Sequence, residues 1–203
     1  MISIQEHAGD GTAASTRLPA RRTSGTGLAQ AVIDTPLGPL VALASDAGLM
    51  GLWFDRQRHA PGPLAADHDA SQRWLAQARV QLAEYFAGRR RTFDVTLAPQ
   101  GTPFQEAVWR RLTAIGFGET TSYGRIAEDV QRPLASRAVG AAVGRNPISI
   151  LVPCHRVIGE NGSLTGYAGG LPRKEALLQL EGRRAGRPSI PPRVPGNTAR
   201  RDL

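Results

Sequence analysis

Ile-Leu-Val-Pro-Cys-His-Arg-Val-Ile, at residues 150–158, is the stretch around which the chain is organised. Its apolar start predicts a buried strand that delivers Cys154, the only cysteine of the protein. A single cysteine forms neither an internal disulfide nor a multi-thiolate zinc site, so it serves either packing or reactivity. A lone buried cysteine is usually inert. However, His155 and Arg156 follow it, and an electropositive, partly open setting lowers a thiol pKa and favours the nucleophilic thiolate.

His155 is a candidate base for this thiol, but it does not follow that the two side chains touch. Adjacent side chains of a strand point to opposite faces, so proton transfer between Cys154 and His155 needs a bridging water or a turn. A third group should then hold the imidazole. Glu181, at the end of a helix predicted over 172–181, is the candidate for that role, and a solvated edge residue is the alternative.

Composition limits the architecture and the compartment. A chain of 203 residues with 41% hydrophobic residues suits one domain or two small ones. We find no apolar run near the roughly 20 residues of a membrane span, and an unpaired cysteine fits a reducing compartment, so we expect a cytoplasmic protein. The net charge is +8, but residues 183–203, predicted to be a disordered Arg/Pro-rich tail, hold six arginines and one aspartate. Basic composition is therefore weak evidence for DNA.

The N-terminal part is predicted to be a small antiparallel domain. Residues 1–27 lack apolar periodicity and are expected to form a disordered arm. In the domain, residues 28–97, three β-like runs between turns predict an antiparallel meander that ends near residue 55. A loop over 56–69 leads to an amphipathic helix predicted over 70–88 and packed on the meander. This part offers no recognisable chemistry.

Residues 98–182 are predicted to form a mostly helical domain. Thr102 and Gln105 have the spacing of a capping box, and Ser122 caps a second short helix. A third helix is predicted over 134–144, and two short helices joined by a tight turn suggest a helix-turn-helix. The third helix carries mostly small residues, whereas a major-groove reader needs several long polar side chains. It lies either close to a DNA groove or in the core.

Two features follow the cysteine. Residues 160–162, Glu-Asn-Gly, predict a hairpin turn, and a Gly-rich loop around Tyr167 is either a pocket wall or an ordinary loop. The last helix places Lys174, the only lysine of the chain, and Glu181 on one face. A single lysine among 25 basic residues suggests that its position requires an ammonium group.

Several separate motifs resemble, in order, those of the 6-O-alkylguanine-DNA alkyltransferases, also called methylated-DNA-protein-cysteine methyltransferases. They cover about 80 residues and lie at 101–105, 108–109, 121–123, 137–140, 144–147, 153–158, 166–170, 173–174 and Glu181. Residues 28–97 resemble the family's ribonuclease-H-like domain more faintly. The predicted fold class is therefore α+β: a ribonuclease-H-like N-terminal domain of antiparallel meander plus helix, then a mostly helical alkyltransferase domain with a helix-turn-helix.

The resemblance implies roles for the central residues. Cys154 would accept the alkyl group after His155 removes its proton through a water, Glu181 would orient His155, and Asn146 would shape the active site. The reaction would be a stoichiometric, irreversible transfer from 6-O-alkylguanine, and from 4-O-methylthymine, to the protein's own cysteine. The protein would thus be a single-turnover methylated-DNA-protein-cysteine S-methyltransferase in DNA repair, without cofactor or metal.

The resemblance also implies the partner. This would be double-stranded DNA containing alkylated guanine, bound through the minor groove without sequence specificity. The protein would act as a monomer and would not bind a membrane. Tyr123 would crowd the 3′ phosphate and drive nucleotide rotation, and Arg137 would replace the flipped base in the stack. Ser136, Ala138 and Arg145 would complete the DNA-binding surface.

The pocket for the base would be walled by four further residues, namely Tyr167, Ala168, Val157 and Lys174. Two positions depart from the family pattern. Gly116 stands where proline is usual, which would loosen that turn, and Ala168 stands where some members have serine, which removes a hydrogen bond to the base.

Three rival interpretations are open. A non-catalytic DNA-lesion binder shares this scaffold but lacks the reactive cysteine. A thiol hydrolase would use Cys154 and His155 with multiple turnover, but we find no oxyanion-hole motif. A sequence-specific regulator is disfavoured by the small residues of the third helix.

Overall fold

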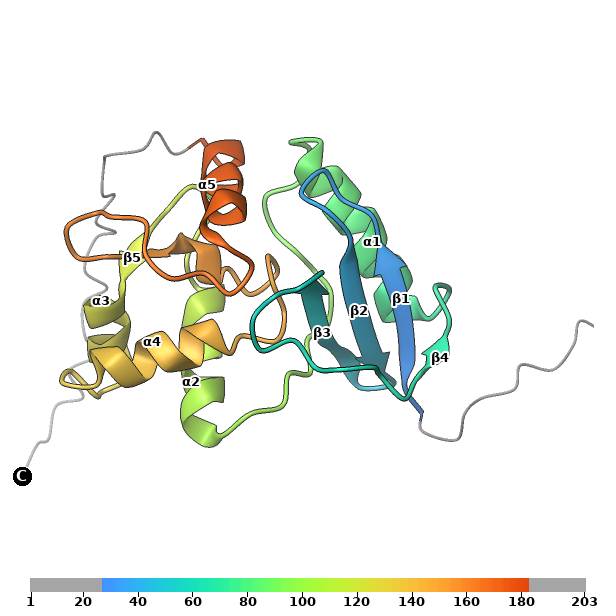
Figure 1. The fold of residues 1–203 in the computed structure, drawn as a ribbon, viewed down its shortest axis with the longest axis horizontal. Helices are drawn as coiled ribbons and strands as arrows, with labels where there is room; N and C mark the ends of the chain where they lie inside the picture. The colour runs from blue at the N-terminus through green and yellow to red at the C-terminus, as the bar shows by residue number, and fades with distance from the viewer. Residues whose placement is uncertain (1–26, 183–203) are drawn as a thin grey trace, which may run out of the picture.

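A four-stranded sheet with one covering helix forms the N-terminal domain of the computed structural model, which describes residues 27–182 (Figure 1). The strands β1 (Ala29–Ile33), β2 (Leu40–Ser45) and β3 (Gly48–Phe54) pair as an antiparallel meander, as predicted. The predicted arm, apart from Gly27, and the predicted tail lie outside the described residues.

The sheet has a fourth strand that the sequence did not indicate. β4 (Asp67–His68) pairs in parallel with β1 inside the stretch predicted to be a loop, and gives the order β3-β2-β1-β4. Two residues are too short for an alternating pattern to be visible. The Gln30 side chain joins β1 to the same loop, because its Nε2 donates to the carbonyl of Ala66 at 2.8 Å.

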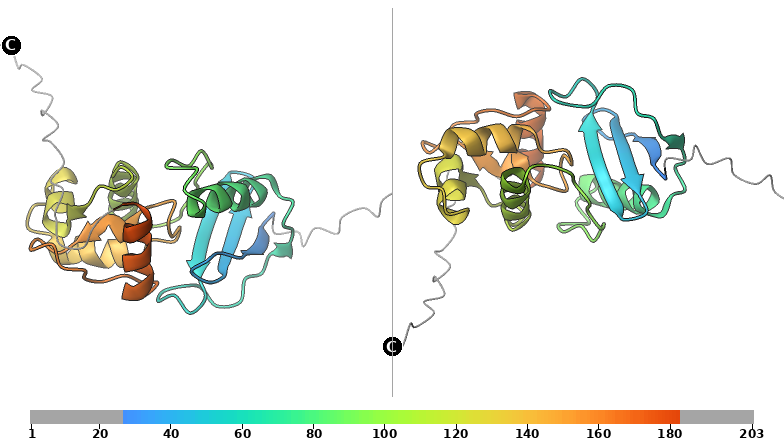
Figure 2. Two further views of the ribbon diagram at one scale, coloured as in Figure 1. Left: turned by 90° about the horizontal axis from the view of Figure 1, so that it is seen from above. Right: turned by 90° about the horizontal axis from the view of Figure 1, so that it is seen from below.

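Helix α1 (Arg73–Phe86) lies on one face of this sheet (Figure 2). Its buried side is formed mainly by Leu75, Ala78, Leu82 and Tyr85, at the helical spacing that predicted it. Tyr85 sits in the last turn, at the end of the helix that faces the C-terminal domain.

The C-terminal domain is mostly helical. Helix α2 (Pro103–Thr113) begins with the predicted capping box, and α3 (Tyr123–Asp129) begins at the predicted Ser122 cap. Both caps satisfy backbone N–H groups that the first helical turn leaves unpaired. The other elements are β5 (Thr121–Ser122), α4 (Ser136–Gly144), the 3-10 turn η1 (Cys154–Arg156), β6 (Val157–Ile158) and α5 (Leu171–Leu180).

Helices α3 and α4 pack together as the helix-turn-helix, with α2 behind them. Because Val139, Ala142 and Val143 are buried while Arg137 and Arg145 are exposed, α4 is a packed helix with a small, open outer face. The indole nitrogen of Trp109, on α2, donates to the carbonyl of Ala142 at 2.8 Å. The two interpretations of the third helix, a helix that lies close to a DNA groove and a helix packed in the core, are therefore compatible.

The predicted strand before Cys154 is wrong. Ile150 has a φ of +71°, and the backbone N–H groups of Leu151 and Cys154 donate to the carbonyls of Ser149 and Val152, two residues earlier. The apolar residues are buried because they pack in the space between the two domains. Their burial gives an apolar run like that of a buried strand, although the backbone is not extended. The turn predicted at 160–162 is present, since Gly162 donates its N–H to the carbonyl of Gly159 and Gly159 donates to that of Ser163, while β6 before it pairs in parallel with β5.

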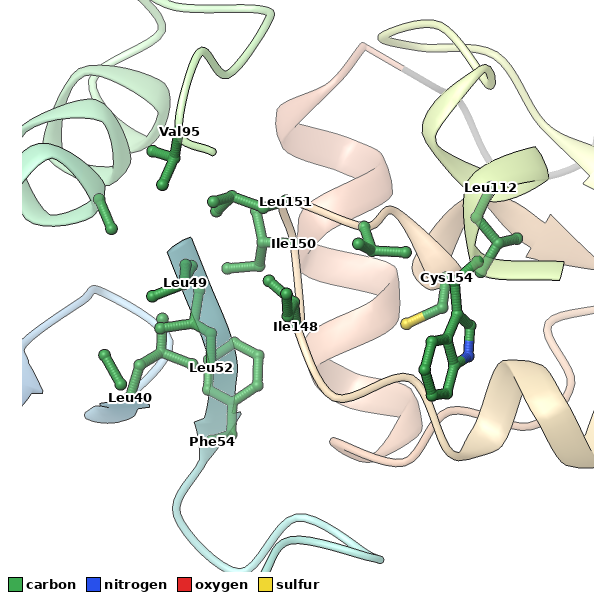
Figure 3. Close-up of a cluster of buried hydrophobic side chains, with 14 of the residues drawn as sticks. Leu40, Leu49, Leu52, Phe54, Val95, Leu112, Ile148, Ile150, Leu151 and Cys154 are labelled. Atoms are coloured by element: carbon green, nitrogen blue, oxygen red, sulfur yellow. The ribbon is translucent and has the colours of Figure 1, made fainter. Parts of the chain in front are cut away.

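The segment 147–152 is held by the N-terminal domain. Leu52, on β3, donates its N–H to the carbonyl of Pro147 and accepts from Ser149, both at 2.8 Å. Figure 3 shows Leu49, Leu52 and Phe54 on one side of this contact and Ile148, Ile150 and Leu151 on the other. One hydrophobic core therefore crosses the domain boundary, and the N-terminal domain supports the segment that leads to the cysteine.

Gly116 closes its turn by a bond that proline cannot make. Its N–H donates to Oε2 of Glu119 at 3.0 Å, and the N–H of Glu119 donates to the carbonyl of Gly116 at 3.1 Å. A proline has no N–H, so this chain replaces a stiff ring with a hydrogen-bonded turn.

Candidate active site

Cys154 begins the turn η1 and is buried, with 4% of its surface exposed. Nδ2 of Asn146 donates to its Sγ at 3.0 Å and to the carbonyl of Val152 at 2.8 Å, while Oδ1 accepts from the N–H of Ile148 at 3.0 Å. Asn146 therefore ties the cysteine to the turns that precede it.

The thiol is not activated by its surroundings alone. Burial raises the pKa of Cys154, although the hydrogen bond from Asn146 and the positive charge of Lys174 act in the opposite direction. The sequence suggests a partly open setting with a lowered pKa, and burial of the thiol reverses that expectation. A base is therefore needed to form the thiolate at neutral pH.

His155 has the protonation state that such a base requires. Its ring is fully buried, Nε2 lies 3.0 Å from Oε1 of Glu181, and Nδ1 has no hydrogen-bond partner within residues 27–182. Burial lowers the pKa of His155, so the ring is neutral. Since a carboxylate only accepts, the proton is assigned to Nε2, and the lone pair of Nδ1 can accept another.

Glu181 is not a solvated edge residue, because it is buried and accepts hydrogen bonds from several residues. Arg156 donates to both of its oxygens at 2.8 Å, Tyr85 donates to Oε1 at 2.7 Å, and Gly118 donates its N–H to Oε2 at 3.2 Å. Burial alone would raise the pKa of Glu181, but the hydrogen bonds from His155 and Arg156 hold it well below its usual range. The carboxylate is therefore ionised.

A cavity of about 440 Å³ opens between the helix-turn-helix, the Gly-rich loop and the N-terminal domain. It brings together five residues singled out in the sequence, namely Tyr123, Ser136, Arg137, Tyr167 and Ala168. Tyr123 and Tyr167 also lie within electrostatic range of the Cys154 sulfur. Arg58 and His59, from the predicted loop of the N-terminal domain, complete one side and were not expected.

The other predicted residues lie around the cavity rather than in its lining. Lys174 is fully buried, and its Nζ donates to the carbonyls of Val157 and Thr165, the latter at 2.6 Å. The ammonium group therefore fastens the loop that carries Tyr167. Ala138, on α4, and Arg145, which follows its last residue, are exposed and lie outside the lining.

Arg156, Tyr85 and Gly118 were missed by the sequence analysis as partners of Glu181. The arginine lies within the central stretch and could have been suspected as the charge that balances a buried carboxylate. Tyr85 gave no signal, because it lies 96 residues from Glu181 and has the helical spacing of an ordinary core residue.

The free energy of unfolding is expected to fall as pH drops below about 6.5, the ordinary pKa of histidine. The folded-state pKa of His155 is lowered, so the unfolded chain binds the proton first and acid favours unfolding. The folded-state pKa of Glu181 is also lowered, so a second loss of stability is expected as pH falls below 4.5, the ordinary pKa of glutamate. Urea unfolding at a series of pH values measures both steps.

A His155→Gln variant separates the two steps. It should lack the upper decline and retain the lower one, because the imidazole is removed while the carboxylate of Glu181 still titrates. A wild-type stability that stays constant down to about pH 5 would contradict the buried neutral imidazole.

The fold and the site define a two-domain α+β protein with one buried thiol beside a hydrogen-bonded imidazole and a helix-turn-helix. Comparisons with known proteins agree. Residues 28–99 match the family model described as 6-O-methylguanine DNA methyltransferase, ribonuclease-like domain, and residues 103–183 match its DNA binding domain. The chain belongs to the 6-O-methylguanine DNA methyltransferase family, which confirms the resemblance.

Individual relatives point the same way. The chain is 47% identical over 155 residues to a methylated-DNA–protein-cysteine methyltransferase of Methanosarcina acetivorans, covering 75% of this chain and 97% of the relative. It is 48% identical over 153 residues to the protein of that name from Mycobacterium tuberculosis, covering 75% and 92%. The crystal structure of Mycobacterium tuberculosis OGT in complex with DNA has a TM-score of 0.71 at 46% identity, covering 75% and 92%.

Within residues 27–182 we find no helix that is long and apolar enough to cross a membrane.

Proposed function

We propose that this protein repairs alkylated DNA by moving the alkyl group from O6 of guanine to Sγ of Cys154. The observation that carries the proposal is a pair of buried contacts beside a cavity that Tyr123 and Tyr167 line: Asn146 binds Sγ of Cys154, and the next residue, neutral His155, binds ionised Glu181. Such a nucleophile, base and orienting group suits nucleophilic attack.

The reaction balances with the groups present. Nδ1 of His155 accepts the thiol proton through a bridging water, and Glu181 stabilises the resulting imidazolium. The thiolate attacks the alkyl carbon, so a C–S bond forms as the C–O6 bond breaks. The imidazolium then returns its proton to the departing guanine. The product is an unreactive thioether on Cys154, so each protein acts once.

The alkylated nucleotide must leave the duplex to reach the cavity. Flipping costs a few kcal/mol, less for a base that pairs poorly. Arg137 is exposed on α4 at the cavity, and we assign it the role of filling the place in the base stack that the flipped base leaves. Tyr123, which also lines the cavity, would contact the neighbouring phosphate. Ser136, Ala138 and Arg145 would meet the backbone in the minor groove.

The small outer face of α4 suits binding without sequence preference. We further propose that the protein acts on DNA as a monomer, accepts 4-O-methylthymine as a second substrate, and works in the cytoplasm, where its single thiol stays reduced.

Intact-protein mass spectrometry tests the proposal. The protein is incubated with excess duplex containing 6-O-methylguanine and then mapped by peptides. One added methyl group on Cys154, with one lesion removed per protein, is the expected result. An unchanged mass with the lesion bound but intact would instead favour a damage-sensing protein.

Arg137→Ala is expected to slow repair in duplex DNA by at least tenfold, while transfer from free 6-O-benzylguanine changes little, because only the duplex requires flipping. Single-turnover rates on both substrates measure this. Arg145→Ala, which alters an exposed arginine of the same surface outside the cavity lining, is the matched control for lost charge. Equal losses on the two substrates would remove Arg137 from the flipping step.

A further inference from the structure

Tyr85 connects the N-terminal domain to the reacting groups. It lies in the last turn of α1, its side chain is fully buried, and its hydroxyl donates to Oε1 of Glu181 at 2.7 Å. We propose that Tyr85 is a positioning residue for alkyl transfer, which acts through Glu181 on the imidazole of His155. The inference rests on the proposed function.

The tyrosine ring is held on several sides. Phe86 and Phe117 meet it edge-on, with ring centroids 5.3 and 6.2 Å away, and Phe93 lies tilted at 5.4 Å. Edge and tilted contacts of this kind are favourable and specific in geometry. The ring cannot turn without disturbing its neighbours, so the hydroxyl is presented to Glu181 from a fixed point.

This hydroxyl affects the oxygen that matters for catalysis. Oε1 of Glu181 accepts from Tyr85, from Nε2 of His155 at 3.0 Å and from Nη2 of Arg156 at 2.8 Å. Among residues 27–182, the donors to the other oxygen are Arg156 and the N–H of Gly118. Three donors share the negative charge of Oε1, so less of it is available to stabilise an imidazolium, and His155 stays neutral and able to accept a proton.

The remaining charges around the imidazole also bear on its titration. Glu181 favours the protonated ring, whereas Arg156, on the same turn, and Lys174, from α5, disfavour it. The phenol of Tyr167 lies within electrostatic range of Cys154, the residue before His155. Tyr85 is the group that α1 contributes to this set. Removing its hydroxyl leaves Glu181 more negative toward His155 without changing any formal charge.

Two effects of Tyr85→Phe follow. The pH at which transfer is half-maximal should rise by roughly half a unit, because His155 becomes easier to protonate. The plateau rate should fall about tenfold, because the carboxylate that orients the ring is held by fewer bonds. The aromatic ring and its packing stay in place.

The experiment measures transfer from free 6-O-benzylguanine across about pH 5 to 8, which spans the titration of histidine. This substrate needs no flipping, so DNA binding does not enter. Phe93→Leu is the matched control: it disturbs the same aromatic cluster without removing the hydroxyl, and should lower stability but leave the half-maximal pH in place. Urea unfolding shows that each variant is folded.

A double-mutant cycle completes the test. If Tyr85 acts through the carboxylate, Tyr85→Phe should have little further effect in a Glu181→Gln protein. An unshifted pH profile, or a full additional loss in the Glu181→Gln protein, overturns the inference. Absence of any transfer by the wild-type protein would instead be a failure of the proposed function.

Discussion

Replacing Cys154 with alanine is expected to abolish alkyl transfer completely while leaving DNA binding within about twofold of the wild type. The chain has one cysteine, so no second thiol can accept the alkyl group. The residues of α4 that we assign to DNA binding lie on a different element and should keep their positions, because Cys154 packs as a small buried side chain. Loss of one sulfur should cost about 1 kcal/mol of stability.

Mass spectrometry and a binding titration on the same duplex measure the two properties separately. Cys154→Ser is the closer control, since it keeps a polar atom within reach of Asn146. Its hydroxyl is far harder to deprotonate than a thiol, so it should also fail to transfer. Stoichiometric methylation of either variant would refute Cys154 as the acceptor.

Arg156→Leu is expected to lower the free energy of unfolding by about 3–5 kcal/mol, the range for breaking one side of a buried ion pair. The guanidinium is buried, donates to both oxygens of Glu181 and also donates to the carbonyl of Ile115. Its removal leaves an ionised carboxylate without its arginine in the protein interior. Urea unfolding measures the change in midpoint at constant slope.

Arg125→Leu is the matched control, because this arginine is 37% exposed and pairs with exposed Glu128 and half-buried Asp129. Exposed pairs contribute about 0–1 kcal/mol, so this variant should be close to the wild type. If Arg156→Leu costs no more than Arg125→Leu, then the buried pair does not hold Glu181 in place. Arg156→Leu should also slow transfer, because Glu181 would no longer be oriented toward His155.

Local patterns predicted the features that depend on nearby residues. The capping box of Thr102 and Gln105 and the Ser122 cap join residues three apart, so their spacing is sufficient. The meander and α1 follow from periodicity and turns in the same way. By contrast, the predicted strand before Cys154 failed because an apolar run shows only that residues are buried, not the backbone that buries them.

The groups proposed to be catalytic divide in the same way into features that the sequence predicts and features that only the fold shows. The motif at 153–158 identified the thiol, its neighbouring imidazole and the family to which they belong. It did not reveal the protonation states, because burial raises the pKa of Cys154 and lowers that of His155, and burial is a property of the folded chain.

The sequence by itself therefore determined the fold class, the family and the residues proposed to react, since these are encoded in contiguous motifs. The tertiary structure alone decided how those residues are supported. Tyr85 meets Glu181 across 96 positions, and β3 pairs with the segment that leads to Cys154. Such contacts depend on how the two domains pack around one core. The spacing of residues along the chain does not show which residues of the two domains lie close together in space.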